Sequence, residues 1–430
     1  MTLRPRLLFL CQTLPYPPDG GVWIRTYHVL RLLARTFDIT ALCFERASSS
    51  ATRAGGDIDT GRDGLGRLAD VEVFPVPQNH SRLRYAWDHL RSVTRGRVYT
   101  QFLYQSRAFQ RRLTELLSST AFDLVHADSL VDLARYLPLC EGLPIVGVHH
   151  NVESDLLRRR AAVETRGVRG AYLRYQARLM QEVERKWCAR VTLNVAVSAP
   201  DRASLQRIAP EARVTVVPNG VDVEELRPTA AQGDGMAFVG GANWFPNRDA
   251  LEFFCGRILP HLRTAGAAAR IRWIGAASAE QQRSYGERYG IELTGYVNDV
   301  TPFARAAACH IVPLRVGGGT RLKILNSWAM GKPVVSTSVG CEGLAAADGD
   351  NILIRDEPRA FADAVMAVLR DAALARRLGE RGRDTAERLY SWDVIGRQMI
   401  DTYMRIALAD LRDRVSAVSP VGPEARIANG

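Results

Sequence analysis

Residues 313–337 read "PLRVGGGTRLKILNSWAMGKPVVST" and carry the clearest structural pattern of the chain. An apolar run leads into three glycines, a segment with helical apolar spacing starts near Thr320, and a second apolar run follows. This alternation predicts a strand-helix-strand unit of a parallel sheet. Glycines let the backbone approach a ligand, and the first amides of a helix attract an anion. The stretch therefore predicts an anion-binding loop between a strand and a helix.

Two cations follow the glycines. The chain has only three lysines against 54 arginines, and Lys323 lies here beside Arg321. Positive charges in the first turn oppose the helix dipole, so the arrangement is poor for an isolated helix and good for binding a diphosphate. The glycine triplet alone also fits an ordinary flexible loop with exposed charges, because it is neither G-x-G-x-x-G nor a P-loop.

Apolar and helical segments alternate along the rest of the chain in two sets of similar length, which predicts an α/β fold. The polar stretch 223–235, with proline and glycine, separates the sets. Ligands of parallel sheets bind at the carboxyl ends of the strands, so two such sheets should face each other across a cleft. The predicted segments are a first domain in 1–222, a linker in 223–235, a second domain in 236–392, a final helix in 393–412 and a disordered tail in 413–430.

Composition narrows the class of protein. The seven cysteines are scattered and form no CxxC pair, which argues against a disulfide framework and a zinc ribbon. No apolar run reaches the roughly 18 residues of a membrane span. The apolar run near the N-terminus is shorter than the roughly 7–15 residues of a signal h-region. We expect a cytoplasmic protein.

The net charge of +11 is concentrated in two stretches. Residues 82–113 hold eight Arg and one Asp, and residues 156–190 hold ten Lys or Arg and three Glu. These stretches are either solvated helix faces or a basic surface for an anionic membrane or substrate. Tyr85 and Trp87 lie among the arginines, as at a bilayer interface. We expect no nucleic-acid partner, since no reading module is present.

Three further motifs carry polar residues or glycines. "GVHHNVES" (147–154) places His149, His150 and Asn151 at a strand end, and no third ligand at metal-site spacing accompanies the histidine pair. "LPYPPDGGVWIRTYH" (14–28) is a connector or a ligand loop. "VPNGVD" (217–222) alone fits a simple Asn-Gly turn. No signature of a covalent nucleophile is present.

Taken in order, these motifs resemble the family 4 glycosyltransferases, which have the GT-B fold. The similarity spans about residues 6–405, and "GGGTR" resembles the exopolysaccharide-type members, including those associated with bacterial exosortase systems. The resemblance implies two Rossmann-like domains, the first binding the acceptor and the second a nucleotide-sugar. It implies hexose transfer with retention, without a metal or other cofactor. The acceptor would be lipid-linked or a polysaccharide, and the basic first domain would meet an anionic membrane at the inner face of the plasma membrane. The last helix would cross back to the first domain.

The resemblance also assigns roles to individual residues. Positive groups near the leaving diphosphate would stabilise the charge that develops there. The implied catalytic residues are His150, Arg321 and Lys323. The implied donor-binding residues are Gly318, Gly319, Thr320, Asn326, Tyr296 and Val297. The implied residues of the acceptor and phosphate loop are Gly20, Gly21, Arg25 and Asn151.

The chain departs from the family pattern in two places. Gly318 and Asn326 stand where many members have glutamates, and Asn326 cannot make the same charge-assisted contact to ribose. "VGGANWFPNRDAL" (239–251) lacks the usual Arg and Lys, and its only cation is Arg248. We favour a diphosphate grip moved to Arg321 and Lys323 over weakened binding. A sugar-nucleotide epimerase of the same fold and a degenerate sugar-nucleotide-binding protein are the alternatives.

Overall fold

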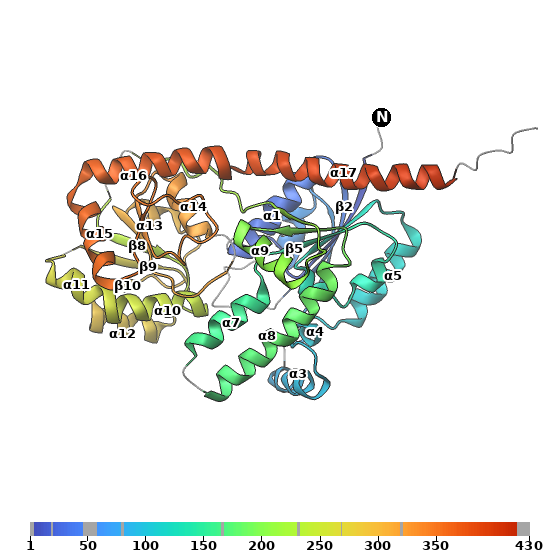
Figure 1. Ribbon diagram of the computed structural model, residues 1–430, viewed down its shortest axis with the longest axis horizontal. Coiled ribbons are helices and arrows are strands. Elements are labelled where there is room, and N and C mark those ends of the chain that lie inside the picture. The colour runs from blue at the N-terminus through green and yellow to red at the C-terminus, as the bar shows by residue number, and fades with distance from the viewer. Residues whose placement is uncertain are drawn as a thin grey trace, which may run out of the picture.

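The computed structural model describes residues 4–18, 20–45, 58–78, 81–164, 167–229, 233–267, 269–318 and 321–418. Within these ranges the chain forms two parallel sheets, each flanked by helices (Figure 1). The strand orders are β3-β2-β1-β4-β5-β6-β7 and β10-β9-β8-β11-β12-β13. The predicted α/β fold of two Rossmann-like domains is therefore confirmed.

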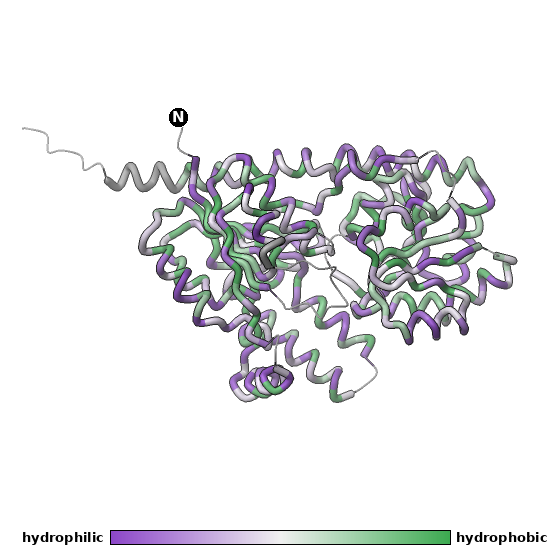
Figure 2. Tube along the Cα trace, turned by 180° about the vertical axis from the view of Figure 1, so that it is seen from behind, coloured by the Kyte–Doolittle hydropathy of each residue, from purple (hydrophilic) through white to green (hydrophobic). Residues whose placement is uncertain are grey.

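The strands of both sheets are short apolar runs. Five of the six residues of β1 are buried, as expected for a central parallel strand covered on both faces. The strands form the hydrophobic centre of each domain (Figure 2). The first sheet contains β1 Arg6–Cys11, β2 Asp38–Glu45, β3 Asp70–Pro75, β4 Leu124–Asp128, β5 Ile145–His149, β6 Leu193–Ala196 and β7 Val214–Val216. The second contains β8 Met236–Val239, β9 Ile271–Ile274, β10 Glu292–Leu293, β11 Cys309–Val312, β12 Val334–Ser336 and β13 Leu353–Ile354.

Helices cover both sheets, and none within the described ranges is long and apolar enough to cross a membrane. The helices of the first domain are α1 Gly21–Leu33, α2 Ile58–Leu65, α3 Arg82–Arg95, α4 Thr100–Leu103, α5 Arg107–Ser119, α6 Leu130–Leu133, α7 Glu153–Val163, α8 Gly167–Cys188 and α9 Ala199–Ile208. Those that follow are α10 Phe245–Phe253, α11 Leu259–Thr264, α12 Ala279–Tyr289, α13 Thr301–Arg305, α14 Leu322–Ala329, α15 Pro358–Arg370, α16 Ala372–Thr385 and α17 Trp392–Val418.

The last helix, α17, lies along both domains (Figure 1). Its first residue, Trp392, stacks on His28 of α1 with ring centres 4.5 Å apart. A Cβ at position 396 would lie 2.6 Å from Leu32, so Gly396 permits the close approach of α17 to α1. The crossing back to the first domain is thus present.

The predicted boundary between helix and tail at residue 412 is wrong. The helix continues to Val418, so residues 413–418 belong to it, and the rest of the predicted tail lies outside the described residues. Residues 413–418 contain no helix breaker, and the first proline of the tail is Pro420. A helix usually ends at or before the residue that precedes a proline, which fits an end at Val418.

Candidate active site

The wall of the cleft on the first domain is built at the carboxyl ends of β4 and β5. His150 follows β5, and its Nε2 lies 3.3 Å from Oδ2 of Asp128, the last residue of β4. The same Oδ2 accepts a hydrogen bond of 2.6 Å from the hydroxyl of Thr26 in α1. A carboxylate only accepts hydrogen bonds, so Nε2 of His150 carries a proton, and in the neutral form of the ring Nδ1 would be an acceptor.

Asp128 stays ionised although it is fully buried. Burial alone would raise the pKa of this carboxyl, but the electrostatic interaction with the ring of His150 and the hydrogen bond from His126 outweigh it and hold the pKa well below its ordinary value. His126 is also buried, and its Nε2 lies 3.4 Å from Oδ1 of Asp128. Sequence reasoning singled out neither residue, although "HAD" (126–128) at a predicted strand end was a usable signal.

The opposite wall is the glycine loop before α14. A Cβ at position 318 would lie 3.0 Å from Oδ1 of Asn151 in the first domain, so the two domains approach closely here. A side chain at position 318 would therefore require Asn151 to shift by a few tenths of an ångström. Two further predicted residues of the loop, Gly319 and Thr320, lie outside the described residues.

Two helices begin at this point of the cleft. A Cβ at Gly21, the first residue of α1, would lie 3.8 Å from Leu322, the first residue of α14. Each helix start carries partial positive charge and unpaired backbone amides. The predicted loop with Gly20 and Gly21 and the predicted loop before α14 therefore meet, and together they favour an anion.

Arg321 does not point a free cation at this anion site. The side chain is buried, and its guanidinium donates to the backbone carbonyls of Val339, at 3.1 Å from Nη2, and of Gly318. These bonds attach the glycine loop to the segment after β12. The structure therefore places Arg321 as a support of the loop rather than at its surface, because the short loop leaves carbonyls that need a buried donor.

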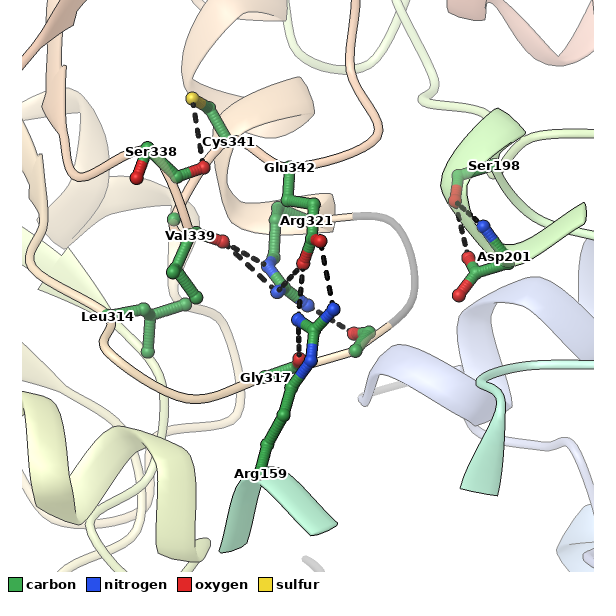
Figure 3. Close-up of polar contacts among 12 residues, drawn as sticks. Arg159, Ser198, Asp201, Leu314, Gly317, Arg321, Ser338, Val339, Cys341 and Glu342 are labelled. Atoms are coloured by element: carbon green, nitrogen blue, oxygen red, sulfur yellow. Dashed lines mark hydrogen bonds and ion pairs between the residues drawn. The ribbon is translucent and has the colours of Figure 1, made fainter. Parts of the chain in front are cut away.

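Arg159 of α7 reaches across the cleft to the same loop, as Figure 3 shows. Its Nη1 donates to the carbonyl oxygen of Gly317 at 2.8 Å, and its Nη2 donates to Oε1 of Glu342 at 2.9 Å. Arg159 and Glu342, together with Ser198 and Gly318, line a hollow between the domains. Sequence reasoning missed Arg159, because it is one of ten cations in 156–190.

Lys323 is the second residue of α14 and faces the first helix of the second domain. Its Nζ donates to Oδ1 of Asn247 in α10 at 2.9 Å and lies 3.8 Å from the ring centre of Phe238. Burial, and then the charge of Arg321, lower the pKa of this ammonium well below its ordinary value. Among the described residues the ammonium of Lys323 donates to Asn247 alone, and it would gain from an anion nearby.

The other predicted residues lie in different surroundings. Asn151 lies at the cleft, where its amide donates to Glu153 at 3.0 Å. Asn326, one turn after Leu322, and Tyr296 are half-buried. Val297 packs instead against the cluster that contains Ala237, Ile274 and Met330.

Arg25 was expected in the phosphate loop, and the structure places it elsewhere. It is only 1% exposed, and it donates to the carbonyl of Val217 at 3.0 Å and to Oδ1 of Asn219 at 2.7 Å. The reason is the position of "VPNGVD", which brings the carbonyls of Val217 and Pro218 and the side chain of Asn219 within hydrogen-bond distance of Arg25. Gly220 of that motif packs on Trp392, so the motif joins α1 to the start of α17.

Comparison with known proteins places both domains in one enzyme class. Residues 19–225 match the family described as "Glycosyltransferase Family 4". Residues 233–371 match the family described as "Glycosyl transferases group 1". The chain belongs to the family 4 glycosyltransferases.

The relatives of this glycosyltransferase agree with that assignment. It is 32% identical over 123 residues to the lipopolysaccharide core biosynthesis glycosyltransferase LpsE of Rhizobium meliloti (strain 1021), a match that covers 27% of this chain and 33% of LpsE. The chain therefore matches only about a third of this curated relative.

Solved structures show the same fold over nearly the whole chain. The sucrose-phosphate synthase of Thermosynechococcus elongatus superposes with a TM-score of 0.69 at 16% identity, covering 94% of this chain and all of that chain (100%). Anabaena Alr3699/HepE in complex with UDP and glucose gives 0.64 at 13% identity, covering 93% of this chain and 99% of that chain. The fold is thus GT-B.

Proposed function

We propose that this glycosyltransferase moves a hexose from a nucleoside-diphosphate sugar to a lipid-linked or polysaccharide acceptor, with retention and without a metal. The observation that carries the proposal is the meeting of the starts of α1 and α14 at the glycine loop, opposite His150. Negative charge develops on the diphosphate as the glycosidic bond to it breaks. Preorganised amides and cations at that point lower the barrier to transfer.

The structure refines the roles that the motifs implied. The backbone amides in the first turn of α14 and the ammonium of Lys323 would receive the diphosphate, and Arg159 would add a cation from the first domain. Arg321 would act through the loop that it supports. His150, which presents Nδ1 as an acceptor, would bind a hydroxyl of the transferred sugar or of the acceptor. HepE, which was solved with UDP and with UDP-glucose, supports a nucleotide-sugar as donor.

The proposed cellular site is the inner face of the plasma membrane, and helix α3 is the element that supports it. Leu83 and Trp87 are 84% and 56% exposed, and Leu90 continues the same stripe. The opposite side of the helix buries Asp88, whose carboxylate accepts from Arg84 at 2.8 Å and from Arg91 at 3.0 Å. The apolar side of α3 therefore faces solvent, which is the inverse of an ordinary surface helix.

Product analysis tests the proposal. Thermal shift with a panel of nucleoside diphosphates, with and without Mg²⁺, first identifies the base, because a ligand bound only to the folded state raises the melting temperature. The matching nucleotide-sugars are then incubated with the protein, with and without a lipid-linked acceptor. Acceptor-dependent release of the diphosphate with an α-linked product from an α-linked donor is expected. Turnover without acceptor would indicate an epimerase, and a β-linked product or a strict need for Mg²⁺ would contradict the proposed mechanism.

A further inference from the structure

The segment "NWFPN" (243–247) stands where the usual cations of the family are absent, and the proposed donor site uses only Asn247. Its Trp244 is 56% exposed, although a tryptophan side chain is large and mostly apolar. Phe245, the next residue, begins α10. The exposed indole therefore lies directly before the first residue of a helix, and that residue contacts Arg160 of the first domain.

Two arginines, one from each domain, lie against the ring of Phe245. The guanidinium carbon of Arg160 in α7 is 5.1 Å from the ring centre, and that of Arg248 in α10 is 5.8 Å from it. Cation-π contact attracts each guanidinium to the ring. The ring of Phe245 thus contacts one guanidinium from each domain.

Neither arginine has a carboxylate partner among the described residues, whereas the neighbouring arginines do. Arg158 pairs with Asp155, Arg159 with Glu342, and Arg169 with Glu164 at 3.1 Å. Nε of Arg160 is buried and makes no hydrogen bond. Buried polar groups without a partner are rare in folded proteins, so an unpaired donor beside a second cation indicates a place for an anion.

Electrostatics agrees with the geometry. The pKa of the Arg160 guanidinium is lowered, first by burial and then by the charges of Arg169 and Arg248, while Glu164 and Tyr85 act in the opposite direction. Tyr85 belongs to α3 and is 55% exposed. The charge of Arg248 thus acts on Arg160 across the interface between the domains.

We propose that Arg160 and Arg248 bind a phosphate group of the acceptor, with the indole of Trp244 packing on the group that the phosphate carries. Arginine matches phosphate geometry through paired N–H donors. The positive start of α10 adds to the attraction. The proposal rests on the proposed transferase function. It assigns the phosphate of the acceptor to a place distinct from that of the donor diphosphate at α14. A phosphate bound by one arginine of each domain also favours the closed arrangement of the domains.

Direct binding tests the site apart from catalysis. The full-length protein is first saturated with the nucleoside diphosphate that the thermal shift identifies, and inorganic pyrophosphate is then titrated by calorimetry. Arg160→Gln and Arg248→Gln should each weaken pyrophosphate binding at least about tenfold and leave nucleotide binding unchanged. Arg178→Gln, at an 82% exposed side chain of α8, is the matched control and should change neither.

A second probe distinguishes whether the phosphate belongs to a lipid or to a free phosphorylated acceptor. Phosphatidylcholine vesicles with and without phosphatidic acid are sedimented with the same variants. Loss of the phosphatidic acid dependence in both arginine variants would indicate a lipid phosphate, and loss of pyrophosphate binding alone would indicate a free phosphorylated acceptor. Unchanged binding of both probes in both variants, or an equal loss in Arg178→Gln, would overturn the site. Absence of transfer by the unmodified protein would instead contradict the proposed function, because neither binding test depends on turnover.

Discussion

Tyr403 and His126 are joined by a hydrogen bond of 2.8 Å between the tyrosine hydroxyl and Nδ1 of the ring, although 277 positions separate them in the chain. Since Nε2 of His126 donates to Asp128, Nδ1 is the acceptor and the hydroxyl donates. Asp128 in turn orients His150. A residue of the crossing helix α17 therefore fixes, through two buried groups, the ring that faces the cleft.

Removing the hydroxyl tests this chain of contacts. Tyr403→Phe should lower kcat several-fold with little change of KM for the donor, because the ring of His150 loses orientation while the diphosphate site is untouched. Asp128→Asn should lower kcat about 100-fold and alter the pH profile of kcat. Tyr390→Phe removes a buried hydroxyl that accepts from Ala345, and it should cost stability only. Equal kinetic effects in both tyrosine variants would refute the positioning role.

The two cations of the glycine loop should separate in their effects. Arg321→Ala leaves buried carbonyls without a donor, so it should cost about 1–3 kcal/mol of unfolding free energy. Lys323→Ala should keep the melting temperature within a few degrees and lose about 100-fold or more in turnover. Denaturant unfolding and steady-state kinetics measure both quantities. A stable and active Lys323→Ala protein would contradict the assigned role of the lysine.

Much of this fold follows from local patterns. The apolar run 6–12 and the strand before the glycines predict β1 and β11, because buried parallel strands are continuous apolar runs. The candidate active site was harder to predict from the sequence. Nothing in the sequence around Arg159 distinguishes it from the other cations of 156–190, because its role depends on how α7 meets a loop more than 150 positions away. Arg25 was misplaced for the same reason, since its acceptors at Val217 and Asn219 are brought to α1 only by the fold.

The ion pair across the cleft should affect donor binding. Arg159→Ala removes the contacts to Gly317 and Glu342, so nucleoside diphosphate binding should weaken about tenfold. Arg158→Ala is the matched control, because its partners Asp155 and Gln181 belong to the first domain. Calorimetric titration of both proteins measures the difference. An unchanged affinity in Arg159→Ala would show that this arginine does not reach the diphosphate.

Acid should destabilise the first domain through His149. Burial disfavours the protonated, charged form of this ring and lowers its pKa from 6.5 to about 4. Between these values the unfolded chain binds more protons, so stability is complete above about pH 6.5 and falls as the pH drops toward 4, by up to about 1.4 kcal/mol per pH unit. In His149→Gln this slope should decrease in urea unfolding at a series of pH values. His261→Gln, at an exposed position, should leave the slope unchanged.

The last prediction concerns membrane association through α3. Replacing Trp87 and Leu90 by serine removes two exposed apolar side chains and leaves the buried contacts of Asp88 intact. Each such side chain contributes about 1.5–3 kcal/mol when it leaves water completely, so partition onto phosphatidylglycerol vesicles should fall tenfold or more. High salt should weaken binding of the unmodified protein, because the arginines of the helix contribute through charge.

The matched control for α3 is Leu408→Ser on α17, where the leucine is 45% exposed. It should partition as the unmodified protein does, and circular dichroism should show all three proteins folded. The fall of partition in the α3 variant should be matched by lower transfer to a vesicle-bound acceptor and by unchanged transfer to a short water-soluble one. Unaltered partition in the α3 variant would show that the apolar side of α3 does not bind a bilayer.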